Sequence, residues 1–148
     1  MSLTLLIAFV GRTVPIEGYP GFVIAEADGT VLALTAAPDP AAQVHCDSTF
    51  TQAHFKTMLY VQGDKFHESG RIDFPGTDSY LIVSTTEAGT ATDETDGTIT
   101  ASMIWHVTAG GGQFKGARGR ITGNSRAGAD GQFTDHQVYK IRLPDQSQ

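Results

Sequence analysis

The segment TITASMIWHVT, residues 98–108, alternates apolar and polar side chains except at Ile104. Successive side chains of a β-strand point to opposite sides, so an alternation with a period of two predicts a strand with one buried face. The polar set includes His106, and turn residues bound the segment at Asp96-Gly97 and at 110–112. The apolar face is made of Ile99, Ala101, Met103, Trp105 and Val107.

Similar short segments continue in both directions from this strand. They are rich in β-branched and aromatic residues and are spaced by roughly 8–12 residues, which is typical of a barrel or a sandwich. Connections this short favour antiparallel neighbours over parallel ones. The expected strands are 3–10, 21–27, 30–36, 44–50, 54–62, 66–74, 80–86, 98–108, 114–122 and 132–143.

The connections between these strands carry their own signals. Asp28-Gly29 between two β-prone runs predicts a two-residue hairpin, since both turn positions require a positive φ. The stretch 37–43 contains Pro38 and Pro40 and is expected to be a loop. The acidic run EAGTATDETD, residues 87–96, is expected to be a long exposed loop.

No segment shows sustained helical periodicity, although one helical turn is conceivable over 48–56. The chain of 148 residues has no linker and no fixed-period repeat, so a single domain over 1–148 is expected. We therefore predict an all-β fold, a small closed antiparallel β-barrel of about 8–10 strands.

Composition excludes several classes of function. Sixteen acidic against ten basic residues give a net charge of -6, which disfavours binding to nucleic acid. The basic residues that cluster from Lys115 to Arg126, with Arg118 and Arg120 between them, lack interleaved aromatic side chains and fit a solvated strand face. The apolar run 3–10 is too short to span a membrane.

The single cysteine, Cys46, allows no internal disulfide and fits a reducing compartment, so a cytoplasmic location is expected. Cys46 adjoins His45, but neighbouring strand residues point to opposite faces, and a buried inert thiol is the simpler interpretation.

Five histidines are spread over separate strands without a His-x-His pair, so no metal site is predicted. Phosphate-binding and dinucleotide-binding signatures are also absent, and we expect no cofactor.

The segment GQFKGARG, residues 112–119, follows the pattern Gly-x-Phe-x-Gly-Ala-x-Gly. This pattern resembles the C-terminal part of allene oxide cyclase-like barrels and their dirigent-like relatives, where it forms a tightly curved strand pair. The resemblance implies a calycin-like barrel whose interior holds a small apolar molecule, and members of this group steer a reactive intermediate mainly through cavity shape. No earlier segment matches that family's catalytic positions, so none is carried over.

Two acidic residues share a face with apolar residues in their strands. Glu68 alternates with Phe66 and Ile72, and Asp135 alternates with Phe133 and Tyr139. If the apolar faces point inward, both carboxylates lie inside the barrel near Trp105 and Met103. A carboxylate in such surroundings must be paired, hydrogen-bonded or protonated, and a raised pKa would suit acid–base catalysis. The alternative is that both lie at strand ends in water, or pair with Arg71 or Arg118.

These residues suggest an enzyme of the cyclase or isomerase type, acting on a small hydrophobic molecule in the barrel interior. Glu68 and Asp135 are then the candidate catalytic residues. A non-catalytic, lipocalin-like carrier of an apolar ligand is the alternative. A purely structural module that forms homo-oligomers through an outer apolar face around Ile104 is a third. The candidate ligand-binding residues are Phe66, Met103, Trp105, Tyr139 and Tyr60, with Tyr80 as a further pocket candidate.

Overall fold

The computed structural model describes residues 1–37 and 50–145, and these form an all-β fold of nine strands. The predictions for 38–49, which include most of the strand expected at 44–50 and both His45 and Cys46, lie outside the described residues. The strands are β1 (Ser2–Pro15), β2 (Phe22–Ala37), β3 (Gln52–Gln62), β4 (Lys65–Asp73), β5 (Tyr80–Thr85), β6 (Gly89–Asp93), β7 (Ile99–Gly111), β8 (Arg118–Ala127) and β9 (Gln132–Arg142).

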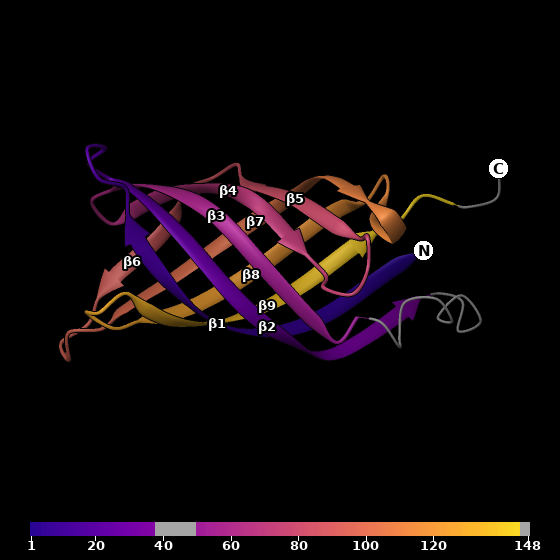
Figure 1. Ribbon diagram of the computed structural model, residues 1–148, viewed down its shortest axis with the longest axis horizontal. Helices are drawn as coiled ribbons and strands as arrows, with labels where there is room; N and C mark the ends of the chain where they lie inside the picture. Colours follow the sequence, from indigo (N-terminus) through magenta and orange to yellow (C-terminus); the bar gives the residue numbers. More distant parts are fainter. Residues whose placement is uncertain (38–49, 146–148) are drawn as a thin grey trace.

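Eight of these strands close into an antiparallel barrel, which confirms the predicted fold class (Figure 1). The order around the barrel is β3-β2-β1-β9-β8-β7-β5-β4, and pairing of β3 with β4 closes the ring. β1 and β9 are neighbours, so the first and last strands of the chain lie side by side from Ser2↔Arg142 to Arg12↔Gln132. Closure gives each of the eight strands a hydrogen-bonded neighbour on both sides over part of its length.

The ninth strand, β6, lies in the run 87–96, where we expected only a loop, so that expectation was wrong. β6 pairs antiparallel with β4 and β7, the same two neighbours that β5 has. It therefore continues the line of β5 after a short break. Gly89 permits this pairing, because a Cβ there would lie 2.3 Å from the Phe66 ring. The polarity of the run predicted exposure correctly at Thr92 and Asp93 but gave no sign of the close contact at Gly89.

The hairpin predicted at Asp28-Gly29 is also wrong, since β2 runs through both residues without turning. The φ of Gly29 is not positive, and its role is steric. A Cβ at Gly29 would lie 2.6 Å from the ring of Phe9 and 2.9 Å from Ile7. The Asp28 carboxylate is on the outer face and accepts a hydrogen bond from His54 Nδ1 at 2.8 Å. Tertiary packing here overrides the local turn signal.

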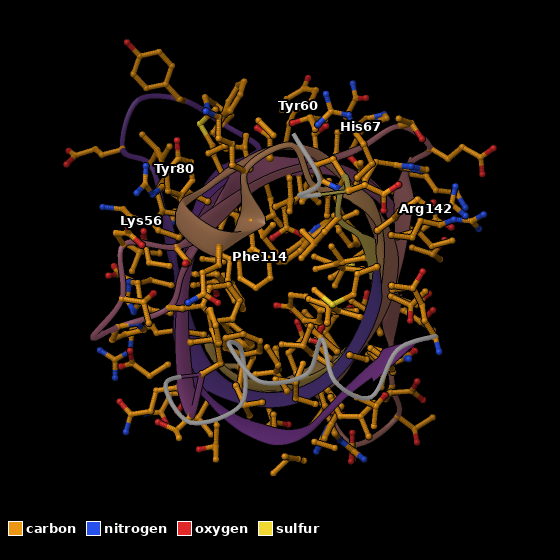
Figure 2. The ribbon with its side chains drawn as sticks, turned by 90° about the vertical axis from the view of Figure 1, so that its right-hand side faces the viewer. Lys56, Tyr60, His67, Tyr80, Phe114 and Arg142 are labelled. Atoms are coloured by element: carbon orange, nitrogen blue, oxygen red, sulfur yellow. The ribbon has the colours of Figure 1, made fainter. Side chains whose placement is uncertain are left out.

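The segment after β7 departs from the expected strand over 114–122. Gly112 and Gly116 have φ values of 60° and 75°, and Gly112–Phe114 form one turn of 3₁₀-helix. This turn directs Phe114 into the end of the barrel, where it lies inside the ring of strands (Figure 2). Its ring centroid is 5.2 Å from that of Phe50 and 5.0 Å from that of Phe74. We call these three phenylalanines the end cluster, and β8 begins only at Arg118.

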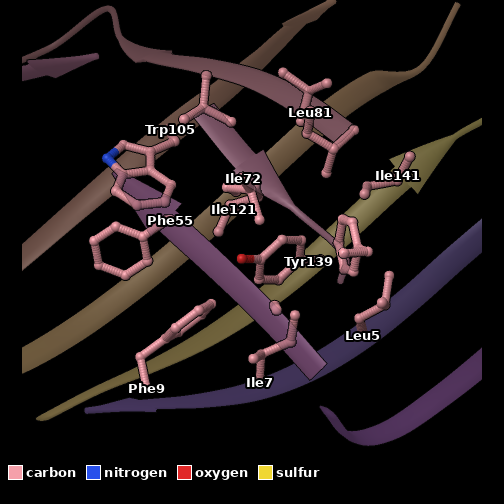
Figure 3. Packing of buried hydrophobic residues seen from close by; sticks show 14 of the residues in the cluster. Leu5, Ile7, Phe9, Phe55, Ile72, Leu81, Trp105, Ile121, Tyr139 and Ile141 are labelled. Carbon is pink, nitrogen blue, oxygen red and sulfur yellow. The ribbon is translucent and has the colours of Figure 1, made fainter. Parts of the chain in front are cut away.

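The barrel interior is an aromatic and aliphatic core (Figure 3). Phe55 is central to it, with ring centroids 4.8 Å from Phe9, 5.4 Å from Trp105 and 6.1 Å from Phe133. An eight-stranded barrel is just wide enough for its interior to be filled by side chains or to hold one small ligand. In the described residues, no helix is long and apolar enough to cross a membrane.

Candidate functional site in the barrel interior

Glu68 lies inside the barrel on β4, with only 8% of its surface exposed. Its Oε2 accepts a hydrogen bond from Thr57 Oγ1 at 2.5 Å, and its Oε1 accepts one from Trp105 Nε1 at 3.0 Å. Gly70 lies directly opposite Thr57 in the sheet, and a Cβ at Gly70 would lie 2.6 Å from the Thr57 Cα. The glycine therefore allows β3 to approach closely enough for Thr57 to reach the carboxyl group.

Burial governs the protonation of Glu68. Removal from water disfavours the carboxylate and raises the pKa of Glu68 from 4.5 to about 7, against the lowering effect of its bonds to Thr57 and Trp105. The negative charge of Asp135 raises it further. A carboxyl group with this pKa exchanges its proton near neutral pH, as a general acid or base requires.

A second set of polar groups lies on β9, where alternate side chains point inward. Asp135, Gln137 and Tyr139 occupy three successive inward positions and are all buried. The Tyr139 hydroxyl donates to Gln137 Oε1 at 2.6 Å, and Gln137 Nε2 donates to Asp135 Oδ2 at 2.8 Å. The amide of Gln137 thus connects the tyrosine hydroxyl to the carboxyl group in one line.

The other oxygen of Asp135 differs from every other buried polar side-chain atom in the described residues. Asp135 Oδ1 accepts no hydrogen bond of ordinary length and angle, although the residue is only 5% exposed. The backbone amide of Asn124 is still close enough to lower the pKa of this carboxyl group. It faces Gly123 on β8, where a Cβ would lie 3.2 Å from Oδ1 and 2.4 Å from Met103 Cε. An unpartnered buried acceptor is costly, so it calls for a proton or for a ligand that donates to it.

The pKa of Asp135 is also raised, chiefly because burial removes the carboxylate from water. The bond from Gln137, the nearby His136 and the backbone amide of Asn124 oppose this effect. Burial likewise raises the pKa of the Tyr139 hydroxyl well above its usual range, and the charge of Asp135 adds to that effect. Tyr139 therefore stays neutral and acts as a donor. The interior thus carries two carboxyl groups with raised pKa values, and the charge of Asp135 contributes to the shift at Glu68.

One end of the barrel is lined by small side chains. Ala91, Ala101 and Ala127 are partly buried and pack against the core. Ala101 lies near the start of β7, whereas the end cluster follows the end of β7, so these alanines mark the opposite end. On β7, Met103 lies between Ala101 and Trp105, and on β4, Phe66 and Glu68 are successive buried positions.

Most of the residues predicted from the sequence lie where the pattern placed them. Glu68 and Asp135 face the interior rather than water, and the predicted lining residues Phe66, Met103, Trp105 and Tyr139 are buried there. Their exposed fractions range from 0% at Tyr139 to 9% at Met103.

Tyr60, in contrast, lies outside the barrel and is 37% exposed, so its assignment to the ligand site was wrong (Figure 2). It occupies the outward set of β3, where its ring is 4.7 Å from that of Phe22. Tyr80 also faces outward, under the guanidinium of Arg71 at 3.9 Å. Arg71 pairs with Asp73 at 2.8 Å and not with an interior carboxylate.

Sequence reasoning missed Thr57 as a partner of Glu68. The signal was present, because Ala53, Phe55 and Thr57 alternate on β3 and predict that the threonine shares the buried face. Gly123 was also missed, and no sequence pattern indicates that Asp135 Oδ1 faces it. Among the described residues, no group of three or more His, Cys, Asp or Glu side chains could hold a metal ion.

Comparison with known proteins gives no relative: no family model, no curated protein and no solved structure matches the chain. The resemblance of 112–119 to allene oxide cyclase-like barrels therefore stays a prediction. The candidate site stands on its own geometry.

Proposed function

We propose that the protein is an enzyme of the isomerase or cyclase type, which binds a small, largely hydrophobic molecule inside the barrel. The observation that carries this proposal is the buried Oδ1 of Asp135, which accepts no well-formed hydrogen bond and shares the barrel interior with a second carboxyl group whose pKa is about 7. Buried carboxyl groups with perturbed pKa values cluster at functional sites.

The chemistry we propose is a proton transfer within one substrate. Asp135 Oδ1 takes a proton from the substrate, and protonated Glu68 gives one to another of its atoms, so the substrate keeps its composition. Proton exchange between the two carboxyl groups then restores the starting state. Thr57 and Trp105 orient Glu68, while Gln137 and Tyr139 orient Asp135. The apolar lining would hold the substrate in its reactive conformation.

A carrier without catalysis is the second candidate, and one observation favours it. Both oxygens of Glu68 already accept hydrogen bonds within the protein, so among the interior carboxyl oxygens of the described residues Asp135 Oδ1 is the one best placed to receive a ligand. A ligand hydroxyl or amine donating to that oxygen would be bound without any proton transfer.

A screen of small molecules extracted from the cells that make the protein can distinguish an enzyme from a carrier. Trp105 is the chain's single tryptophan, is 1% exposed and bonds to Glu68, so its fluorescence reports ligand binding in the interior. The extract is fractionated, and each fraction that changes the Trp105 fluorescence is incubated with the wild type, Glu68→Gln or Asp135→Asn. Conversion of its components to new products measures turnover. Glu17→Gln, an exposed position, is the matched control.

For an enzyme, we expect both interior variants to lose about 100-fold or more in turnover with affinity largely kept, since general acid–base groups contribute that much. For a carrier, we expect no turnover, and Asp135→Asn alone weakens binding. If neither variant changes turnover or affinity, the interior carboxyl groups have no functional role and the core is purely structural.

A further inference from the structure

An open groove of about 660 Å³ lies on the outer surface of the barrel, across β7, β8, β9 and β1. Its charged side chains point outward, because exposed Arg120 and Lys140 alternate with buried Ile121 and Tyr139. Figure 2 shows Arg142 directed away from the barrel interior. The groove has no Asp or Glu in its lining, and its basic residues are His106, Arg118, Arg120, Lys140 and Arg142. We call these five residues the basic groove.

The sheet register places like charges directly opposite one another in the basic groove. Arg118 is paired with Arg142, and Arg120 is paired with Lys140. On its other side, Arg120 faces His106 of β7. Directly opposed side chains on one face lie close together, with Cβ atoms roughly 4.5–5.5 Å apart, and like charges at such positions are destabilising. The fold carries two repulsive pairs at one place.

Nothing in the described part of the chain neutralises this charge. The ion pairs there involve Arg71, Arg126 and His54, and none involves a residue of the basic groove. Lys140 Nζ donates only to Thr4 Oγ1 at 3.2 Å, and Arg118 donates to the neighbouring carbonyl of Ala117 at 2.7 Å. Four of the ten Lys and Arg residues of an acidic chain are thus gathered without an acidic partner.

We propose that the basic groove binds a small anion with two or more negative charges, of the phosphate-ester class. Such a ligand would relieve both repulsive pairs at once, since an anion between them interacts favourably with each. Guanidinium groups match the geometry of phosphate oxygens through paired hydrogen bonds. The hydroxyl groups of Ser2 and Thr4, also in the lining, are further donors. The volume suits a small molecule.

Phosphate of this kind reaches a protein either as a free metabolite or as a lipid headgroup, and two probes distinguish these sources. The first is inorganic pyrophosphate, added to the full chain and followed by the backbone amide NMR signals. The second is sedimentation with vesicles of neutral phosphatidylcholine with or without a phosphatidylinositol phosphate.

The test variant is Arg120→Gln with Lys140→Gln, which removes one opposed pair. The control is Arg12→Gln, which removes one exposed charge at the other end of β1. We expect pyrophosphate to shift the amides of Gly119 and Arg120, and the double variant to bind at least about tenfold more weakly, since charge-assisted hydrogen bonds are strong. Because repulsion is removed, the double variant should melt at the same temperature as the wild type or higher.

Binding of pyrophosphate that the double variant loses and Arg12→Gln keeps supports the proposal for a soluble ligand. Binding to phosphoinositide vesicles alone, with the same pattern among variants, supports it for a lipid headgroup. The proposal is overturned if neither probe binds, if all variants bind equally, or if a DNA duplex binds more tightly than pyrophosphate. Asp135→Asn should bind pyrophosphate like the wild type, so this test is independent of the interior site.

Discussion

Two acidic side chains, Glu68 and Asp135, distinguish this barrel from a purely apolar core. Their inward orientation could be predicted, because each alternates with aromatic residues on the same strand. The reading of Tyr60 as a lining residue failed, since an aromatic side chain fits either face of a strand and only the alternation with Phe55 and Thr57 identifies the inner one. The weak hydrogen bonding of Asp135 Oδ1 depends on distances between strands, so it could not be predicted from the sequence.

The raised pKa of Glu68 makes the free energy of unfolding depend on pH. The folded state holds the proton up to about pH 7, whereas the unfolded chain releases it near 4.5. Stability is therefore full below about pH 4.5 and falls as the pH rises through 7. At about 1.4 kcal/mol per pH unit of difference, the loss is about 3 kcal/mol.

Urea unfolding at pH 5 and pH 8 measures this dependence. The wild type should lose more stability between the two than Glu68→Gln, in which a neutral amide of the same shape replaces the carboxyl group. Glu17→Gln should behave like the wild type. Equal losses in the wild type and Glu68→Gln would show that Glu68 titrates normally.

At the scale of single elements, glycine accounts for most differences between prediction and structure. Asp28-Gly29 has the composition of a turn, and 87–96 has the composition of a loop, yet both contribute strand. In each case the glycine makes room for an aromatic ring on a neighbouring strand, Phe9 or Phe66. The sequence shows the glycine but not the ring that it contacts. Whether a glycine serves a turn or makes room for a neighbouring side chain can therefore be decided only when the strand pairing is known.

Gly29→Ala tests the steric role of Gly29. Its Cβ would lie 2.6 Å from the ring of Phe9, and we expect a loss of about 1–3 kcal/mol in the free energy of unfolding, typical of an overpacked core. Thr30→Ala, the exposed neighbour, should change stability by less than about 0.5 kcal/mol. If Gly29→Ala lost as little stability as the control, the backbone of β2 would have shifted to accommodate the added Cβ. The close contact with Phe9 would then not require a glycine at position 29.

The end cluster gives a second prediction at this scale. Phe114→Ala removes a ring that is 1% exposed and contacts Phe50 and Phe74, so it should cost about 3–5 kcal/mol. Thermal and urea unfolding measure the loss, and Lys115→Ala, at an exposed position, is the control. A cost below about 1 kcal/mol would show that Phe114 does not close the end of the barrel.

At the scale of the whole molecule, the barrel separates two kinds of chemistry. The interior holds protonatable carboxyl groups among apolar side chains. The outer face of β7, β8, β9 and β1 holds basic groups that form no ion pair with the described residues. One continuous ring of strands connects them, and β1, the first strand of the chain, pairs with β9, the last, from Ser2↔Arg142 to Arg12↔Gln132. Because each strand depends on two neighbours, we expect the barrel to unfold as one unit.

Cooperative unfolding has a simple check. Fluorescence of Trp105 reports the interior, and far-ultraviolet circular dichroism reports the strands as a whole. The two urea transitions should coincide within error. Separate midpoints would mean that the interior site opens before the barrel does, and stability measurements could not then be interpreted with two states.

The proposed function requires Glu68 and Asp135 to interact and exchange protons inside the barrel. Carbon-detected NMR of the side-chain carboxyl groups between pH 3 and 9, on the wild type and Asp135→Asn, tests it directly. The account predicts that Glu68 titrates with a pKa of about 7 in the wild type and at a lower pH in Asp135→Asn, since the charge of Asp135 raises its pKa. A Glu68 pKa near 4.5, unchanged in Asp135→Asn, would contradict it.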